Sequence, residues 1–401
     1  MTATSIHTPQ STRQSWGAVL AMSLAAFALV ASEFMPVSLL TPIAADLQIS
    51  EGQAGQGIAV SGLFALLTSL GIASVAARVE RKLLLLSLTL LMIISGSVVA
   101  FAPNYVTFMA GRALIGVAIG GFWSLSAATA MRLVGADQVP RALAIVNGGN
   151  ALATVIAAPL GSFVGALIGW RGAFFCVVPV AALAALWLLL SLPAIKHERS
   201  DKSGNVFRLM NRAPVALGMV AVSVFFMGQF MLFTYLRPFL ETVTHVSVSM
   251  LSLMLLVLGI AGLVGTFLIE RFLRNGLYQT LIAIPILMAL IAVALVAFGS
   301  SPMTTTLLLG LWGLVATAAP VGWWTWLART LPDDAEAGGG LMVAIVQLAI
   351  GLGATVGGLV FDLSGYRATF ELSAALLLLA AVLACLAARA TLRTPLMASM
   401  N

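Results

Sequence analysis

The chain has 401 residues and a formal net charge of +6; 61% of its residues are hydrophobic and only 8% are charged. Soluble globular domains carry about 25% charged residues, so this composition excludes a soluble globular fold. It indicates a protein that is surrounded by lipid. The Lys and Arg residues are scattered through short polar segments and form no patch with aromatic residues, which argues against a nucleic-acid partner.

Apolar runs of membrane-spanning length recur from Trp16 almost to the C-terminus. A bilayer core needs roughly 20 apolar residues per helix. Taken in chain order, the runs predict twelve spanning helices at about 16–40, 53–77, 83–101, 105–131, 142–168, 172–193, 213–239, 248–269, 277–299, 303–328, 338–361 and 368–389. We therefore expect an all-α membrane protein.

The longest polar stretch between these runs follows the sixth one and divides the chain six plus six. We expect a cytoplasmic N-terminal tail (1–15), an N-terminal six-helix bundle (16–195), a cytoplasmic central loop (196–212), a C-terminal six-helix bundle (213–390) and a cytoplasmic tail (391–401). The first apolar run is long enough to span, so we expect the N-terminal tail to be retained rather than removed with a signal peptide.

The basic residues predict the orientation of these helices. With twelve spans and a cytoplasmic N-terminus, sixteen of the twenty Lys and Arg residues fall on the cytoplasmic side. Arg171, Arg237 and Arg367 lie near the other side, and Arg112 lies inside a span. Positive residues are retained in the cytoplasm during insertion, so we expect both termini there.

The two halves of the sequence also repeat one another. Three short matches stand in similar places of the two halves: Gly169–Phe174 with Gly365–Phe370, Glu80-Arg81 with Glu270-Arg271, and Ala144–Asn147 with Ala344–Gln347. Together they favour two parallel six-helix repeats. Such repeats surround a central site near the membrane midplane in many transporters.

Three motifs resemble those of the major facilitator superfamily, in its proton-linked drug-efflux type. They are the loop Arg78-Val79-Glu80-Arg81-Lys82 after the second run, the series Arg112, Gly116 and Gly120 in the fourth, and the antiporter motif around Pro159, Gly161 and Gly165 in the fifth. The family's usual glycines are missing from the loop, and alanine replaces the glycine before Pro159. The resemblance implies a twelve-helix transporter in a bacterial inner membrane.

A closer likeness, to the bacterial purine ribonucleoside efflux pumps, covers nearly the whole chain. It is carried by the segments 33–56, 121–134, 156–171, 233–238 and 320–330. The resemblance implies a proton-driven antiporter that exports inosine, guanosine and purine analogues by alternating access. Sugar-efflux and chloramphenicol-efflux families share parts of the pattern, so broader drug efflux or sugar efflux stays open as an alternative.

Two ionisable residues lie inside the predicted spans. Glu33, about 17 residues into the first run, is a carboxylate at a depth where a charge costs roughly 2.5–3.5 kcal/mol. We interpret Glu33 as a proton-coupling residue; a structural carboxylate bonded to a neighbouring helix is the alternative. Arg112 either assists proton transfer or bonds backbone carbonyls and holds the first and fourth spans together.

Aromatic and amide residues in the predicted spans are candidates for binding a purine, because bases stack on aromatic faces and amides hydrogen-bond their edges. The alternative for each aromatic is anchoring at the membrane interface. The candidates are Trp123, Asn147, Asn150, Gln229, Phe233, Tyr235, Trp323, Trp324 and Gln347.

Charged loop residues are predicted to form a gate on the cytoplasmic side, or to act only in setting topology: Arg78, Glu80, Arg81, Lys82, Glu270 and Arg271. Small residues that recur in the fifth and eleventh runs predict close helix packing that also permits sliding. They are Gly148, Gly149, Gly161 and Gly165, and Gly351, Gly353, Gly357 and Gly358.

No other class fits the sequence as well. A GxxxxGK[ST] loop is absent, so a proton gradient rather than ATP is the expected energy source, and no cofactor is expected. His7, His197 and His245 lie outside the spans, and the two cysteines form no CxxC pair, so neither a metal site nor an intramembrane enzyme is predicted. A non-transporting receptor on a transporter fold stays open. We expect protons, a small solute and lipid as partners of a monomer.

Overall fold

The computed structural model describes residues 12–135, 138–193, 206–331 and 334–398, and its long elements are all α-helices. Parts of both expected tails and most of the expected central loop lie outside these residues. The first half contains α1 (Thr12–Leu47), α2 (Glu51–Ala76), α3 (Arg81–Ala100), α4 (Tyr105–Leu133) and α5 (Val139–Ser191). The second contains the short 3-10 helix η2 (Val206–Asn211), α6 (Ala213–Thr234), α7 (Leu236–Thr242), α8 (Val248–Phe298), α9 (Pro302–Ala316), α10 (Ala319–Thr330) and α11 (Ala335–Ala398).

Three helices are far longer than one membrane crossing requires. α5, α8 and α11 have 53, 51 and 64 residues, whereas about 20 residues span a bilayer core. Each is interrupted at a glycine with non-helical backbone angles: Gly169 in α5, Gly276 in α8 and Gly365 in α11. These glycines stand where the sequence predicts one span to end and the next to begin.

The first and third breaks explain the clearest internal repeat. Gly169 and Gly365 have φ values of 78° and 79°, a region that only glycine adopts readily. Gly-Trp-Arg and Gly-Tyr-Arg therefore mark the same turn in the two halves. Among the described residues, nine helical stretches are long and apolar enough to span a membrane, and three of these nine are broken in two. The all-α membrane fold is confirmed, while the count of twelve crossings stays a prediction.

Two predicted helices are interrupted where the sequence analysis expected continuous ones. The stretch 213–239 is divided between α6 and α7, and 303–328 between α9 and α10. Pro238 and Pro320 lack the backbone N–H that would bond the carbonyl four residues earlier. Those carbonyls belong to Thr234 and Ala316, the residues at which α6 and α9 end.

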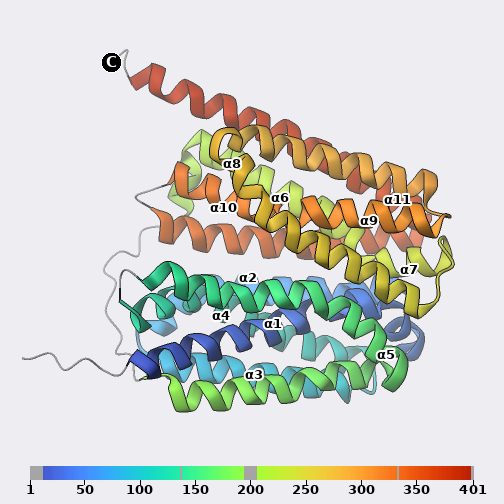
Figure 1. Cartoon of the computed structure of the whole chain (residues 1–401), viewed down its shortest axis with the longest axis horizontal. Helices are drawn as coiled ribbons and strands as arrows, with labels where there is room; N and C mark the ends of the chain where they lie inside the picture. Colours follow the sequence, from blue (N-terminus) through green and yellow to red (C-terminus); the bar gives the residue numbers. More distant parts are fainter. Residues whose placement is uncertain (1–11, 136–137, 194–205, 332–333, 399–401) are drawn as a thin grey trace, which may run out of the picture.

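The helices form two bundles (Figure 1), α1–α5 in one and α6–α11 in the other. Each has its own apolar core: one contains buried residues from Ala18 to Leu192 together with Tyr235, and the other contains mainly residues from Leu209 to Ala384. Helix α2 packs against α11 and α5 against α8, which joins the bundles. The described chain begins and ends at the same end of the molecule, on the left of Figure 1.

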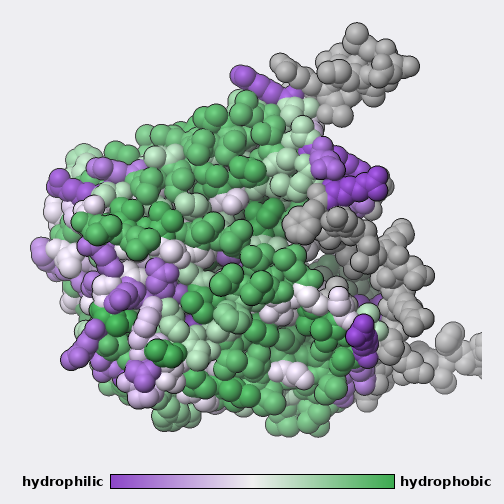
Figure 2. Space-filling model, turned by 180° about the vertical axis from the view of Figure 1, so that it is seen from behind, coloured by the Kyte–Doolittle hydropathy of each residue, from purple (hydrophilic) through white to green (hydrophobic). Residues whose placement is uncertain are grey.

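Apolar side chains also cover the outside. Leu190, Leu290 and Leu307 are between 61% and 77% exposed. Figure 2 shows apolar residues over most of one face and hydrophilic residues gathered mainly toward the two ends. Such a continuous apolar surface is suited to lipid rather than water.

Candidate functional site

Helix α1 contains two prolines, and each leaves one backbone carbonyl without its helical partner. Pro36 and Pro42 have no N–H to donate to the carbonyls of Ser32 and Ser38, four residues earlier. Buried carbonyls without a donor are costly in an apolar interior. Both carbonyls receive a hydrogen bond from an arginine, and these two arginines come from different bundles.

Arg112 of α4 satisfies the first carbonyl. Its side chain is only 1% exposed, and its Nη1 donates to Ser32 O at 2.7 Å. Nε donates to Gly57 O at 3.0 Å, and Nη2 donates to Glu33 O at 3.1 Å and to Ser61 Oγ at 3.2 Å. Arg112 therefore ties α4 to α1 and α2 through backbone oxygens and a hydroxyl. This is the bridging geometry that the sequence analysis weighed against assistance in proton transfer; the proton role stays a prediction.

Arg237 of α7 satisfies the second carbonyl across the boundary between the bundles. It is 7% exposed; its Nη1 donates to Ser38 O, and its Nε donates to Glu241 Oε1 at 2.8 Å. The sequence analysis placed Arg237 near the outer side but gave it no function. The signal was present, because Pro42 shows that Ser38 needs an external donor.

Glu33 lies beside the first of these carbonyls and faces the other bundle. Its side chain is 6% exposed, and its Oε1 accepts a hydrogen bond of 3.2 Å from Nε2 of Gln347 on α11. Gln347 is also 6% exposed. The pair thus joins the two bundles through two buried polar side chains, which the sequence analysis selected separately.

The residue after Glu33 begins a cluster of aromatic rings. Phe34 on α1 stacks on Phe230 of α6 with ring centroids 5.6 Å apart, and Phe230 also contacts Phe226 and Phe233. Gln229 precedes Phe230 on the same helix, and its buried Oε1 accepts no hydrogen bond from the part of the chain that the structure describes. Such an orphan acceptor costs about 1–3 kcal/mol, so it is available to a donor from a ligand. We call Glu33, Phe34, Gln229, Phe230, Phe233 and Gln347 the central site.

Phe34, Phe226 and Phe230 were missed by the sequence analysis. α6 is apolar on all sides, so periodicity does not distinguish the face that meets α1. The position of Phe34 next to Glu33 was the one signal that could have identified it.

The other residues predicted to bind substrate differ from the central site in their contacts and exposure. Trp323 is buried against Phe225 and Trp326 in the second core, whereas Trp324 is 45% exposed. Trp123 is half-buried and packs edge-on against Phe122. Asn147 is exposed and donates to Leu143 O of its own helix, and Asn150 is half-buried. Trp323 is linked to Phe230 of the central site through the rings of Phe225 and Phe226. The contacts of Trp123 and Asn147 are with residues of their own helices.

Tyr235, also predicted to bind substrate, forms part of the joint between the bundles. It is fully buried; its hydroxyl donates to Ala354 O at 2.7 Å, and its ring stacks on Phe361 at 5.2 Å. A side chain added at Gly55 of α2 or Gly358 of α11 would collide with the Tyr235 hydroxyl. Both helices therefore require glycine where they enclose this ring.

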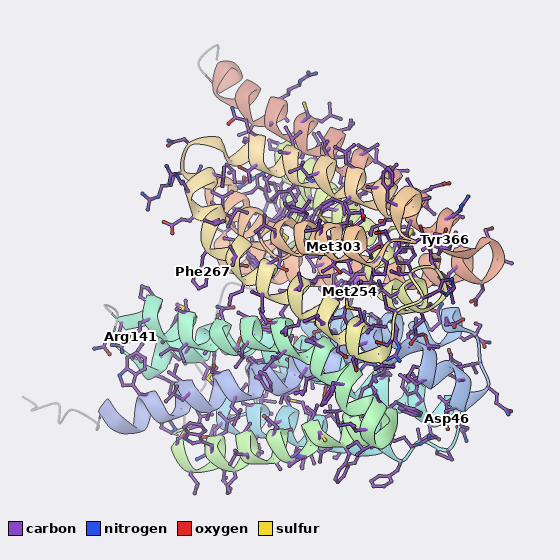
Figure 3. The ribbon with its side chains drawn as sticks, turned by 45° about the vertical axis from the view of Figure 1, so that its right-hand side comes forward. Asp46, Arg141, Met254, Phe267, Met303 and Tyr366 are labelled. Atoms are coloured by element: carbon purple, nitrogen blue, oxygen red, sulfur yellow. The ribbon has the colours of Figure 1, made fainter. Side chains whose placement is uncertain are left out.

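Further hydrogen bonds join α2 to α11 near Tyr235. Asp362 accepts from Ser50 Oγ at 2.5 Å and from Gly52 N at 3.0 Å, and Thr355 Oγ1 donates to Gln56 Oε1 at 3.0 Å. We call Ser50, Gly52, Gln56, Thr355 and Asp362, with Tyr235 and Arg237, the outer contact. It belongs to the end of the molecule where Asp46 and Tyr366 lie, opposite Arg141 (Figure 3).

The predicted motif residues differ in their surroundings. Pro159 and Gly161 of the antiporter motif are buried, and side chains added at Gly161 and Gly165 would press on Ser38 and Leu39 of α1. The motif therefore permits close packing of α5 on α1. Of the predicted gate residues, Arg78, Glu270 and Arg271 are exposed, and Glu80, Arg81 and Lys82 are half-buried. Glu270 pairs with Arg274 of its own helix at 2.8 Å. The gate function stays a prediction.

Comparison with known proteins identifies the family. A family model of the Major Facilitator Superfamily matches residues 22–342. The chain belongs to this superfamily. Because the superfamily consists of transporters, the expected MFS fold and the expectation that the protein is not an enzyme are confirmed.

Two relatives cover nearly the whole chain. The chain is 63% identical over 379 residues to the transcription regulatory protein OpdE of Pseudomonas aeruginosa, covering 94% of each. It is 40% identical over 379 residues to the purine ribonucleoside efflux pump NepI of Salmonella paratyphi B, covering 94% of this chain and 96% of that pump.

A solved structure supports the fold. It is that of a bacterial homolog of the human lysosomal transporter Spinster, in an inward-facing and unoccupied conformation. The TM-score is 0.77 at 18% identity, over 96% of this chain and 99% of the other. At this identity the likeness concerns the fold alone.

Proposed function

We propose that this MFS transporter is a proton-driven antiporter that exports purine ribonucleosides, such as inosine and guanosine, and purine analogues. The observation that carries the proposal is the buried Glu33–Gln347 pair, which lies where the two bundles meet. The 40% identity to a purine ribonucleoside efflux pump supports the choice of solute.

Proton coupling follows from the surroundings of Glu33. A buried carboxylate is costly unless it is paired, so the group needs a proton or hydrogen-bond donors. Gln347 supplies one donor. A solute N–H or O–H in the central site would compete with a proton for the rest of the carboxylate. Protons entering down their gradient would therefore release the solute, and no ATP or other cofactor is required.

The same site offers the groups that a purine nucleoside needs. Stacking on an aromatic ring contributes about 1–3 kcal/mol per base; Phe34 follows Glu33 on α1, and Phe230 and Phe233 continue the ring cluster on α6. The free Oε1 of Gln229 can accept a hydrogen bond from a base N–H or a ribose hydroxyl. The nucleoside would bind at the boundary of the bundles, where it affects their relative position.

Alternating access supplies the motion. The outer contact joins the bundles at one end, so the opposite state requires its hydrogen bonds to break. The described chain begins and ends at one end of the molecule. We assign this end to the cytoplasmic side of a bacterial inner membrane, because most Lys and Arg residues are expected there. One chain contains both bundles and is proposed to work as a monomer.

A broader drug exporter, or a sugar exporter, is the second candidate. The apolar rings of the central site favour the drug exporter, since they bind many flat molecules without reading their edges. Removing the acceptor of Gln229 separates the two functions. Gln229→Leu is expected to abolish nucleoside export but to leave export of a drug such as chloramphenicol unchanged.

The name of OpdE suggests an effect on transcription in that organism. We propose that any such effect of the present chain arises indirectly, from a change in the intracellular concentration of the exported solute. A transport-inactive variant would then lose the effect on transcription together with transport.

The decisive test is uptake of radiolabelled inosine into inverted vesicles that contain the protein, with and without an imposed proton gradient. We expect gradient-dependent accumulation. Glu33→Gln should abolish it while leaving exchange of inosine across the membrane intact, because the neutral amide can bind solute but cannot ionise and so cannot take up or release a proton. Glu371→Gln, at an exposed position, is the matched control. Accumulation that persists in Glu33→Gln would assign the proton to another residue.

A further inference from the structure

A pocket lies in the C-terminal bundle, and none of its lining residues belongs to the central site. It has a volume of about 440 Å³ and lies where α8 breaks at Gly276, α10 ends and the last turns of α11 pass. Pockets of roughly 300–1,000 Å³ hold small molecules in proteins. Polar side chains line it from all three helices: Arg274, Asn275, Tyr278, Arg329, Thr330 and Thr391.

The arginines give the pocket positive charge. Among the described residues Arg329 donates a single hydrogen bond, from Nη2 to Leu273 O at 3.2 Å. A guanidinium has five N–H donors, so most of them remain for a ligand. Arg274 pairs with Glu270 at 2.8 Å, but both side chains are more than 70% exposed. Exposed ion pairs are screened by water and contribute little to stability, so an anion can replace Glu270 at little cost.

The far wall of the pocket is fixed. The hydroxyls of Tyr278 and Thr391 are hydrogen-bonded at 2.8 Å, which links α8 to α11. Thr391 Oγ1 also donates to Ala387 O at 2.9 Å, so Tyr278 supplies the proton of the shared bond. Both hydroxyls hold the helices in place, and the arginines are left as the groups that select the ligand.

The position of the pocket along the helices limits the classes of ligand that it can bind. The pocket stands at the end of apolar helices, and Phe272, close to it in sequence, is 62% exposed. Phosphate groups of membrane lipids occupy this level of a bilayer, and basic pockets between helices bind them. Planar guanidinium groups bind phosphate oxygens with two parallel hydrogen bonds.

We propose that this pocket is a phosphate-binding site, which holds either the headgroup of an anionic membrane lipid or a free phosphate ion. Arg274 and Arg329 bind the phosphate oxygens from two sides. The site is independent of the solute and proton chemistry of the central site. It lies within one bundle, so a bound phosphate would hold the break of α8 against α10 and α11.

The test measures binding to the purified full-length protein. One arm compares retention of phosphatidylglycerol with that of phosphatidylcholine by native mass spectrometry, and the other titrates inorganic phosphate in lipid-free detergent. Each arginine near an anionic surface contributes about fivefold in affinity, so Arg274→Gln with Arg329→Gln should weaken binding roughly 25-fold. Arg271→Gln, an exposed arginine outside the pocket, is the control for surface charge; it removes one charge and should weaken binding by no more than about fivefold.

Each outcome decides the proposal. Selective retention of phosphatidylglycerol that the double variant loses assigns the site to lipid, and saturable phosphate binding that it loses assigns the site to the free ion. Absence of both overturns the proposal, as does an equal loss in Arg271→Gln, because surface charge alone would then explain binding. Circular dichroism of each variant verifies folding, and a misfolded double variant is replaced by Arg329→Lys, whose point charge should bind more weakly than the arginine fork.

Discussion

Arg112 and Arg237 perform the same chemistry in two regions of the molecule. Each donates to a carbonyl of α1 that a proline has left without a partner. The partners of Arg112 all belong to the N-terminal bundle, whereas Arg237 reaches from the C-terminal bundle into the N-terminal one. The same type of bond therefore holds helices together within one bundle at Arg112 and connects the two bundles at Arg237, and under the proposed alternating access only the second must break.

The largest effect is expected at the joint within one bundle. Arg112→Leu removes four hydrogen bonds and leaves the Ser32 carbonyl, which has no helical donor, without a partner; such a buried acceptor costs about 1–3 kcal/mol. We expect little folded protein. The yield and the thermal unfolding temperature of the detergent-solubilised protein measure this. Both values for Arg112→Lys should lie between those of the unmodified protein and those of Arg112→Leu. A stable Arg112→Leu variant would contradict the assignment of Arg112 as a joint.

At the boundary between the bundles, loss of the arginine–carbonyl hydrogen bond should change the relative position of the bundles rather than the amount of folded protein. Arg237→Gln removes a charge-assisted hydrogen bond worth about 1.5–3 kcal/mol, which shifts an equilibrium on the order of 10- to 100-fold. We expect the outer end to open. Electron–electron double resonance between spin labels at Val106→Cys and Leu363→Cys, both exposed, reports the separation after Cys176 and Cys385 are replaced by Ser.

The control for Arg237 is a second arginine at the same end. Arg171 pairs with Asp46, and both belong to the N-terminal bundle. Arg171→Gln loses the same charge without crossing the boundary, so the distance between the labels should not change. Equal opening in both variants would mean that net charge, and not the Ser38 carbonyl, closes the outer end.

Glycine contacts at the outer end provide a smaller test. Gly55→Ala places a methyl group against the Tyr235 hydroxyl, and overpacking of this kind costs about 1–3 kcal/mol. Opening of the same spin-label pair is expected. Gly71→Ala, on the same helix with open space around it, should leave the distance unchanged. An effect at Gly71 equal to that at Gly55 would attribute the result to helix propensity.

The smallest effect is a coupling between Pro42 and Arg237. Pro42→Ala restores a backbone N–H that can bond Ser38 O inside α1, so the carbonyl no longer needs Arg237. The opening caused by Arg237→Gln should therefore shrink in the Pro42→Ala background, with a coupling of about 0.5–3 kcal/mol. Additive effects of the two substitutions would refute the shared carbonyl.

The fold was largely predictable, because lipid forces helices to satisfy their own backbone bonds and to expose apolar side chains. The repeated Gly169 and Gly365 motifs even marked two of the turns. The breaks between α6 and α7 and between α9 and α10 were missed, since an apolar run continues through Pro238 and Pro320. A hydropathy pattern measures composition, and these breaks depend on one missing donor each.

The central site was predictable only in part. Glu33 and Gln347 were identified because polar side chains are conspicuous in apolar runs, but they are 314 residues apart and only the fold brings them together. Phe34 and Phe230 resemble any lipid-facing aromatic in sequence, so their stacking was not predictable. Tyr235 was predicted to bind substrate, and in the structure its hydroxyl donates to a backbone carbonyl of α11, a contact that the sequence does not indicate.

Asp362 of α11 accepts a hydrogen bond from the backbone N–H of Gly52, and this bond provides a way to measure the relative position of the two bundles. In the first turn of α2 the Gly52 N–H is bonded by the other bundle, whereas the N–H groups of Gln53 and Ala54 are bonded to Ser50, so the Gly52 amide hydrogen is protected only while the outer end is closed. Hydrogen–deuterium exchange at this turn would therefore report the position of the two bundles in the unmodified protein. Adding solute or changing the proton gradient should alter the exchange rate there before any label is introduced.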